Sequence, residues 1–336
     1  MFVLRRAGKI ILILLVFVII LFKVSTDYYI VRPGSSEPLR ELVYVEGGNT
    51  NSSGDFYLTT VNQTSANLLV WLYGYFNPYV ELVEREEVIP EDMEIDDYRE
   101  LMEEYMEDSK MISKVVALQN AGYDIEVESH GIEVINISEN SPARGILQEG
   151  DLIVEVDGKE VTFAEEMVEI VKNREAGMSV ELKFKRGDET YTEELKTVER
   201  TGEGGGKQAA LEVYIRTEGW SPVLPRNIEI DSGEIGGPSA GLMFALEIKN
   251  QLTDYDLTGG EKIAGTGTIN SEERIGSVGG VRHKMVSAQE EGVRYFFVPR
   301  ANARIAEYVE EYYDDFDAVI VDDFGDAIEF LHNLDQ

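Results

Sequence analysis

Residues 228–252 read IEIDSGEIGGPSAGLMFALEIKNQL, and this stretch decides the fold of the C-terminal part of the chain. The alternation in 228–230 predicts a short strand, and the apolar spacing that follows Gly241 predicts a helix. The glycines and Pro238 between the two favour a tight turn that leaves backbone amides exposed where the helix begins. We therefore expect Ser239 at a helix N-terminus, with N–H groups directed at whatever approaches its hydroxyl.

Exposed amides beside a serine hydroxyl are suited to acyl transfer, because fixed donors stabilise the negative charge that develops on the attacked carbonyl oxygen. The candidate donors for this oxyanion hole are the backbone amides of Gly237, Ser239 and Ala240. Serine is also common at helix starts for structural reasons alone. A catalytic interpretation of Ser239 therefore needs a second residue that activates its hydroxyl.

Lys284 is the candidate for that second residue. Residues 276–288 (GSVGGVRHKMVSA) predict a loop that enters a helix, and Lys284 falls on the same arc of this helix as its apolar residues. A lysine on an inward face pairs with an anion, extends to the surface or becomes neutral, and a neutral amine can take a proton from serine. Neighbouring helix positions are about 100° apart, so we predict that His283 points outward, which disfavours the alternative Ser–His–Asp triad.

The composition restricts the remaining chemistry. Of the 336 residues, 64 are Asp or Glu and 30 are Lys or Arg, and the net charge of −34 disfavours nucleic-acid binding. The absence of cysteine excludes disulfides, thiolate metal sites and cysteine nucleophiles. The chain contains neither an H-E-x-x-H motif nor a G-x-x-x-x-G-K-[ST] loop. We therefore expect no metal, no ATP and no other cofactor.

The acidic segment 81–108 offers the carboxylates of a calcium site but lacks the ligand spacing of a calcium-binding loop. Its apolar positions recur at helical spacing instead. This pattern predicts a helix with one solvated, charged face.

The N-terminus carries a run of apolar residues, 10–22 (IILILLVFVIILF), preceded by Arg5, Arg6 and Lys9. The run is short for a membrane-spanning helix, so the core of a cleaved signal peptide is the alternative. Because no small-residue cleavage site follows, we predict an uncleaved anchor in the lipid bilayer, formed by residues 1–27. The basic residues keep the N-terminus in the cytoplasm, so the remainder lies outside the cell under either interpretation.

Residues 131–161 (GIEVINISENSPARGILQEGDLIVEVDGKEV) predict two strands around a helical turn, and a helix and two further strands follow. The segment 125–200 resembles a bacterial PDZ domain. The resemblance implies peptide binding by strand addition, with the peptide carboxylate at the loop of His130, Gly131 and Ile132. A domain that only spaces or gates its neighbour is the alternative. The glycine-rich residues 201–207 predict a linker.

The C-terminal region, 208–336, resembles the proteolytic domain of Lon-family peptidases, which use a Ser–Lys dyad. The matching motifs are Gly237-Pro238-Ser239-Ala240-Gly241, Thr266-Gly267-Thr268-Ile269 and Gly279-Gly280 before Lys284. The resemblance implies that Ser239 is the nucleophile, that Lys284 is the general base and that Thr266 supplies a supporting hydroxyl. The turn 271–274 departs from the family pattern, in which a glycine turn is usual, and we expect no loss of activity from it.

The whole layout resembles the membrane-anchored PDZ–Lon peptidases of Gram-positive bacteria. This resemblance implies an α+β fold in which strands of 28–124, notably DFYLTTV (55–61), join the protease core, with the PDZ domain inserted into that core or preceding it. The expected function is that of an ATP-independent, membrane-anchored serine endopeptidase that cleaves peptides or proteins outside the cell. The alternative is a non-catalytic, membrane-tethered PDZ scaffold with an inactive protease-like domain.

Overall fold

The computed structural model describes residues 9, 12, 15–16, 19, 21–77, 80–89, 93–125, 130–201, 207–313 and 315–334. Within these residues, no helix combines the length and the apolar character needed to cross a membrane. Most of the predicted anchor, 1–27, lies outside the described residues. The anchor therefore stays a prediction.

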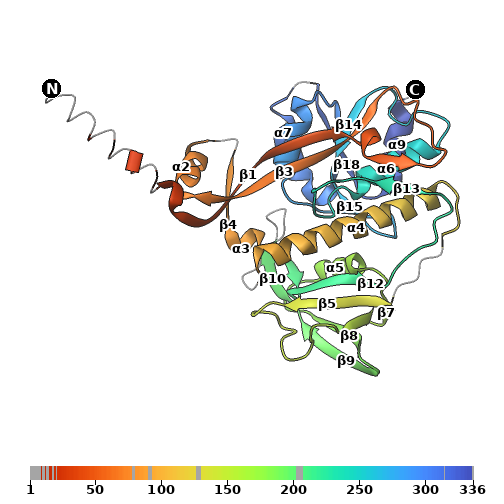
Figure 1. The fold of residues 1–336 in the computed structure, drawn as a ribbon. Coiled ribbons are helices and arrows are strands. Elements are labelled where there is room, and N and C mark those ends of the chain that lie inside the picture. Colours follow the sequence, from red (N-terminus) through yellow and green to blue (C-terminus); the bar gives the residue numbers. More distant parts are fainter. Residues whose placement is uncertain are drawn as a thin grey trace.

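The larger lobe is built on a six-stranded sheet with the strand order β18-β17-β14-β3-β1-β4 (Figure 1). Strands β14, β17 and β18 run parallel to one another, and β1 pairs antiparallel with both β3 and β4. The bounds are β1 (Ser25–Pro38), β3 (Asp55–Asn67), β4 (Glu81–Glu84), β14 (Lys262–Gly265), β17 (Tyr295–Pro299) and β18 (Asp317–Val321).

The parallel pair β3–β14 confirms that the early segment joins the C-terminal core. Its register runs from Asp55 opposite Lys262 to Leu58 opposite Gly265. Since the predicted PDZ segment lies between these two strands in the chain, it is inserted into the core of the larger lobe.

Helices cover both faces of this sheet. On one face Phe56 and Leu58 pack with α4, α6 and α9, and on the other Tyr57 packs with α7 and α8. The alternation follows from the period of two in a strand, which sends successive side chains to opposite faces. The helices are α4 (Ile95–Asn120), α6 (Gly241–Leu252), α7 (Val281–Glu290), α8 (Ala303–Glu310) and α9 (Phe324–Leu334). Two short ribbons, β2 (Val43–Val45) with β13 (Ile228–Ile230) and β15 (Thr268–Ile269) with β16 (Ile275–Gly276), complete the lobe.

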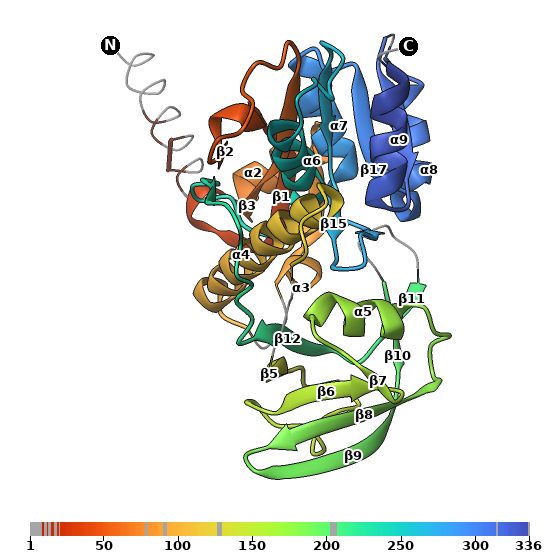
Figure 2. The same cartoon turned by 90° about the vertical axis from the view of Figure 1, so that its right-hand side faces the viewer.

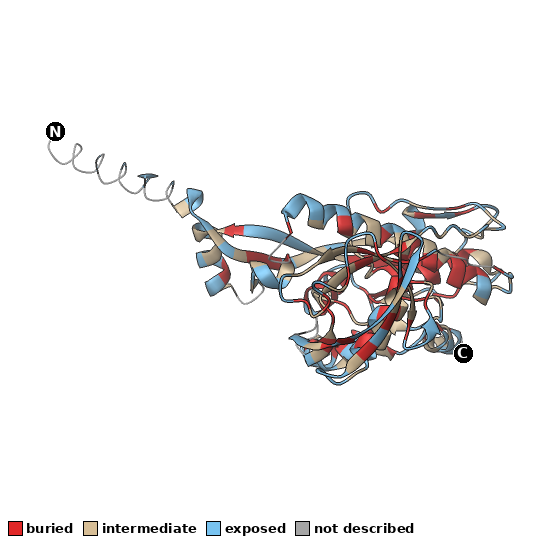
Figure 3. Ribbon diagram, turned by 90° about the horizontal axis from the view of Figure 1, so that it is seen from below, coloured by how far each residue is buried: buried red, intermediate tan, exposed pale blue. Residues whose placement is uncertain are grey.

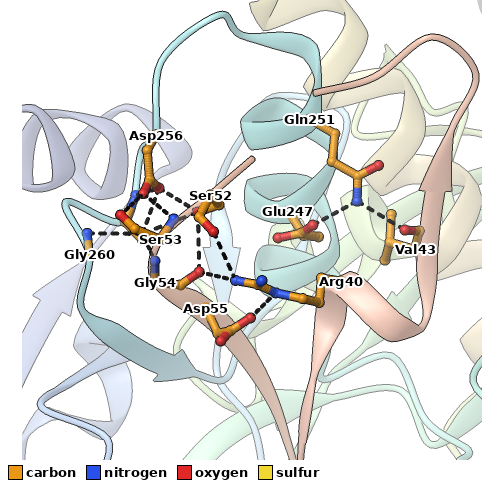
Figure 4. A network of polar contacts seen from close by, with 11 residues as sticks. Arg40, Val43, Ser52, Ser53, Gly54, Asp55, Glu247, Gln251, Asp256 and Gly260 are labelled. Atoms are coloured by element: carbon orange, nitrogen blue, oxygen red, sulfur yellow. Dashed lines mark hydrogen bonds and ion pairs between the residues drawn. The ribbon is translucent and has the colours of Figure 1, made fainter. Parts of the chain in front are cut away.

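A hydrogen-bond network fastens the start of β3 to the loop after α6 (Figure 4). The Asp256 carboxylate accepts bonds from Ser52 Oγ (2.5 Å), from the Ser53 amide (2.7 Å) and from Ser53 Oγ (2.7 Å). Partial burial opposes ionisation, but these bonds and those from Thr258 keep the pKa of Asp256 below its ordinary value. The network therefore holds the edge of the loop against the strand that pairs with β14.

The smaller lobe holds a second sheet with the strand order β12-β5-β6-β8-β9, to which the short β7 adds beside β6. Its elements are β5 (Gly131–Ile137), β6 (Leu152–Val156), β7 (Lys159–Glu160), α5 (Ala164–Lys172), β8 (Ser179–Arg186), β9 (Glu189–Lys196) and β12 (Val213–Glu218). The domain boundary at residue 200 is therefore too early, because β12 completes this sheet from within the predicted protease segment.

The predicted linker, 201–207, is bounded by paired strands. Strand β10 (Val198–Thr201) runs antiparallel to β11 (Lys207–Ala210). The intervening residues, 202–206, lie outside the described residues.

Helix α4 crosses between the two lobes, with α5 and β12 on one side of it and the larger lobe on the other (Figure 2). Buried residues gather inside the lobes (Figure 3). The buried residues of α4 lie mainly in its C-terminal half, from Ser109 to Leu118. The acidic segment thus forms a strand, β4, and a helix with one charged face, as its spacing predicts for the helix. Two short helices, α2 (Leu68–Phe76) and α3 (Arg85–Val88), lie near the N-terminal end (Figure 1).

Candidate active site

Ser239 lies in a tight turn directly before α6. The helix begins at Gly241, where a Cβ would lie 2.8 Å from Ser109 Oγ and 3.0 Å from Ile269 Cγ2. Only glycine allows α4 and β15 to approach the start of the helix so closely. This close approach fixes the turn that carries the serine.

Lys284 is placed by the start of α7. Gly280 has a φ of +67°, and a Cβ there would lie 2.6 Å from Val61 of β3. The amide of Lys284 donates to the Gly280 carbonyl, 3.0 Å away, one helical turn earlier. The inward position predicted from the helical spacing is confirmed, because 4% of Lys284 is exposed.

The lysine amine and the serine hydroxyl are in direct contact. Lys284 Nζ lies 2.6 Å from Ser239 Oγ and 2.9 Å from Thr266 Oγ1. Thr266 follows β14, is 1% exposed, and donates through Oγ1 to the Ser239 carbonyl at 3.0 Å. The geometry brings together the three side chains that the sequence singled out, and it holds the amine within proton-transfer reach of the hydroxyl.

The predicted oxyanion hole is only partly available. The Gly237 amide donates to the Met102 carbonyl of α4 at 2.8 Å, so its inclusion among the free donors is wrong for this conformation. Within the described residues, the amides of Ser239 and Ala240 make no hydrogen bond. These two amides are therefore the donors that remain for a developing oxyanion.

The prediction that His283 points outward is wrong. His283 is 2% exposed, and its Nε2 lies 3.1 Å from Glu81 Oε2 of β4. Both residues 283 and 284 are buried because α7 packs against β1 and β3 of the sheet and also against α8. The imidazole is thereby committed to Glu81, whose pKa is lowered by this hydrogen bond.

The predicted carboxylate loop of the PDZ segment is also wrong. The strand that includes Gly131 and Ile132 is β5, which pairs with β12 on one side and with β6 on the other. The amide of His130 donates to the Glu218 carbonyl of β12. No further strand can add to an interior strand, because both rows of its backbone groups are already paired.

Helix α4 supports the serine turn, and the sequence did not indicate this. Besides Met102, Ser109 Oγ donates to the Pro238 carbonyl at 3.0 Å and Ser113 Oγ donates to the Gly241 carbonyl at 2.8 Å. The signal that could have shown it is a pair of serines four residues apart, on the apolar side of an otherwise charged helix.

Two known protein families match this chain, and they agree with the fold and with this site. The family "Lon protease (S16) C-terminal proteolytic domain" matches residues 228–333, and the family "PDZ domain" matches residues 119–197. The chain contains both domains, and the matches support a serine-type peptidase.

Several relatives that match part of this chain are Lon proteases. The Lon protease of Mycoplasma pneumoniae is 33% identical over 110 residues, 32% of this chain and 14% of the relative. The Lon protease of Roseiflexus castenholzii is 32% identical over 105 residues, 30% of this chain and 13% of the relative. The similarity thus spans about an eighth of the length of these Lon proteases.

Two solved structures also have partial similarity to this chain. The PDZ domain of the SdrC-like protein from Listeria monocytogenes is 23% identical with a TM-score of 0.25, covering 27% of this chain and 92% of that chain. The PDZ domain of the SdrC-like protein from Listeria innocua is 27% identical with a TM-score of 0.23, covering 25% of this chain and 92% of that chain.

Proposed function

We propose that this protein is an ATP-independent serine endopeptidase, anchored in the cell membrane by its N-terminal segment, that cleaves peptides or proteins outside the cell. The observation that carries the catalytic part is the 2.6 Å contact between Lys284 Nζ and Ser239 Oγ. The apolar run 10–22 with its basic N-terminal flank supports the anchor and the exterior location of the two domains.

The dyad supplies both the nucleophile and the proton carrier. A neutral Lys284 amine takes the hydroxyl proton as Ser239 Oγ attacks the carbonyl carbon of the substrate. The amides of Ser239 and Ala240 stabilise the oxyanion, and the Lys284 ammonium then protonates the leaving amine as the C–N bond breaks. Water, deprotonated by the same amine, hydrolyses the acyl-enzyme and the proton returns to Ser239. Burial favours this cycle because it disfavours the charged form of a lysine.

A fluorophosphonate probe tests the dyad in the purified full chain. We expect labelling of Ser239, complete loss of labelling and of peptide cleavage in Ser239→Ala, and severe loss in Lys284→Arg, whose guanidinium does not take up the proton. Ser35→Ala serves as a matched control on an exposed serine. Labelling of the wild type is expected to rise with pH as more amine is neutral. Failure of the probe to label Ser239 would support the non-catalytic scaffold instead.

We further propose that the PDZ domain gates the protease. Strand β12 is the outer strand of its sheet, and a PDZ peptide binds by adding to such an edge. Here α4 occupies that edge: Tyr105 Oη donates to the Ile215 carbonyl at 3.0 Å, and the Asp108 carboxylate accepts from the Thr217 amide. A peptide added along β12 uses the same backbone groups, so it has to displace α4.

Helix α4 also contacts the turn that carries Ser239, so its displacement from β12 affects the active site. The Met102 carbonyl, which accepts the hydrogen bond of the Gly237 amide, lies one turn before Tyr105 on α4. On the same side of the PDZ domain, which faces the larger lobe, Ser271 Oγ and Asn270 Nδ2 bond to Glu166 and Glu169 of α5. Loss of the α4–β12 contacts therefore removes a support of the turn of α4 that carries Met102, and this loosens the bond that withholds the Gly237 amide from the oxyanion hole.

Tyr105→Phe tests the gate without a known ligand. The variant loses one hydrogen bond, worth about 1 kcal/mol, so the open form becomes about fivefold more populated. We expect hydrogen exchange in residues 213–218 and at the Gly237 amide to quicken by about this factor, with Tyr44→Phe as the control on an exposed tyrosine. Unchanged exchange in 213–218 would contradict the gate, while faster exchange there without a change at Gly237 would contradict the coupling.

A further inference from the structure

Helix α2 presents an apolar stripe to solvent. Its sequence is LLVWLYGYF, and the exposed large side chains include Leu69, Leu72, Tyr73 and Phe76, which recur at the i, i+3, i+4, i+7 spacing of one helix face. Phe76 is 76% exposed. The opposite side is the packed one, because Gly74 is buried and a Cβ there would lie 2.9 Å from Leu82 of β4. The stripe is therefore the outward face of a helix that the fold holds in place.

The stripe lies where the chain leaves the predicted anchor. The amide of Leu68 donates to the Val24 carbonyl at 2.9 Å, so α2 begins beside the last residue before β1. Figure 1 shows α2 at the far end of the arm formed by the paired strands β1 and β3 (the β1–β3 arm), beside the start of β1 and away from the two lobes. Any bilayer that contains residues 10–22 reaches α2 before it reaches the rest of the protein.

The region that contains α2 differs from the rest of the chain in its charge and its aromatic content. No charged residue occurs between Asp55 and Glu81, in a chain of net charge −34. Trp71 stacks on Tyr75 with ring centroids 5.8 Å apart, and Tyr28 lies 6.3 Å from Trp71. Tryptophan and tyrosine are the side chains enriched at membrane–water interfaces, where one end is apolar and the other is hydrated.

We propose that α2 is a second membrane-contacting element, which lies in the outer interface of the bilayer with its stripe in the lipid. The inference rests on the membrane anchoring in the proposed function. With the anchor, α2 fixes the β1–β3 arm against the membrane surface, and through β3 it sets the orientation of the sheet that carries the active site. The occupant is lipid, because an uncharged, aromatic face fits the headgroup boundary.

Tryptophan quenching by brominated lipid tests this directly, because Trp71 and Trp220 are the two tryptophans of the chain. The full chain with Trp220→Phe is reconstituted into phosphatidylcholine vesicles brominated either near the headgroup end or near the terminus of the acyl chains. We expect Trp71 emission to be lost mainly with bromine near the headgroup end. The paired Trp71→Phe protein, which keeps only Trp220, is expected to retain its emission with both lipids.

Vesicle flotation distinguishes a failure of the α2 contact from a failure of the anchor. A chain that floats with the vesicles but keeps its Trp71 emission overturns the role of α2 and leaves the anchor standing. A chain that does not float overturns both. Trp71 emission that is already blue-shifted without lipid, and is unchanged by brominated lipid, overturns the lipid contact in favour of a second copy of the chain. Leu72→Glu with Phe76→Glu is expected to abolish the quenching, while Tyr44→Glu, on an exposed aromatic of β2, leaves it intact.

Discussion

Replacing Thr266 by valine removes one hydroxyl from the site and little volume. The Thr266 hydroxyl accepts from Lys284 Nζ at 2.9 Å and donates to the Ser239 carbonyl at 3.0 Å. The Gly267 amide still donates to that carbonyl at 2.9 Å, so the serine turn keeps one of its two bonds. The main loss is the acceptor for the amine, which becomes an ammonium as the reaction proceeds.

The size of the expected loss of activity follows from the positive charge that Lys284 acquires. A hydrogen bond to a charged group is worth about 1.5–3 kcal/mol, so kcat/KM is expected to fall by about ten- to a hundredfold. The loss falls on kcat, because the bond strengthens as the proton moves to Lys284. Without the acceptor the ammonium is less stable, so the rising limb of the pH–rate profile is expected to shift to lower pH while the maximum rate falls.

The assay is peptide hydrolysis as a function of pH, with Thr266→Ser as the matched variant and thermal unfolding as the check on folding. The serine variant keeps the hydroxyl and is expected to recover most of the activity. If the valine and serine variants are equally impaired, the effect comes from packing and not from the hydrogen bond. Wild-type activity in the valine variant would refute the supporting role altogether.

Two further predictions concern buried titratable groups. Burial, with Asp108 and Glu166 nearby, raises the pKa of Glu165 to about 7, above its ordinary value of 4.5, so its stabilising contribution is present at low pH and is lost as pH rises through 7. Glu165→Gln is therefore expected to gain stability relative to the wild type between pH ~5 and ~8, by about 3 kcal/mol in chemical denaturation, and a constant difference would contradict the assignment. His283→Ala is expected to lower the free energy of unfolding by about 1–3 kcal/mol, because it leaves a cavity and removes the bond to Glu81. Its kcat per folded molecule is expected to stay near the wild-type value, and a loss as large as that of Lys284→Arg would revive the Ser–His–Asp alternative.

Periodicity and motif spacing predicted the local part of the site. The turn before a helix at Ser239 and the inward position of Lys284 follow from glycine, proline and the helical repeat. That 55–61 (DFYLTTV) joins the protease core was predicted from the resemblance, and the pairing of 55–58 with 262–265 confirms it. The turn and the inward lysine are properties of a short stretch of chain. The strand pairing is a property of a fold shared with related proteins.

The sequence by itself determined that a serine would stand at a helix start, that a lysine would face inward, and that an acidic surface without cysteine would surround them. Only the tertiary structure decided that Met102 occupies the Gly237 amide, that His283 is buried against Glu81, and that β5 is an interior strand. The reason is that local periodicity states which side of an element is apolar, whereas the partner of each backbone group is set by residues far along the chain. Those distant partners decide which backbone donors, strand edges and imidazoles remain available for binding or catalysis.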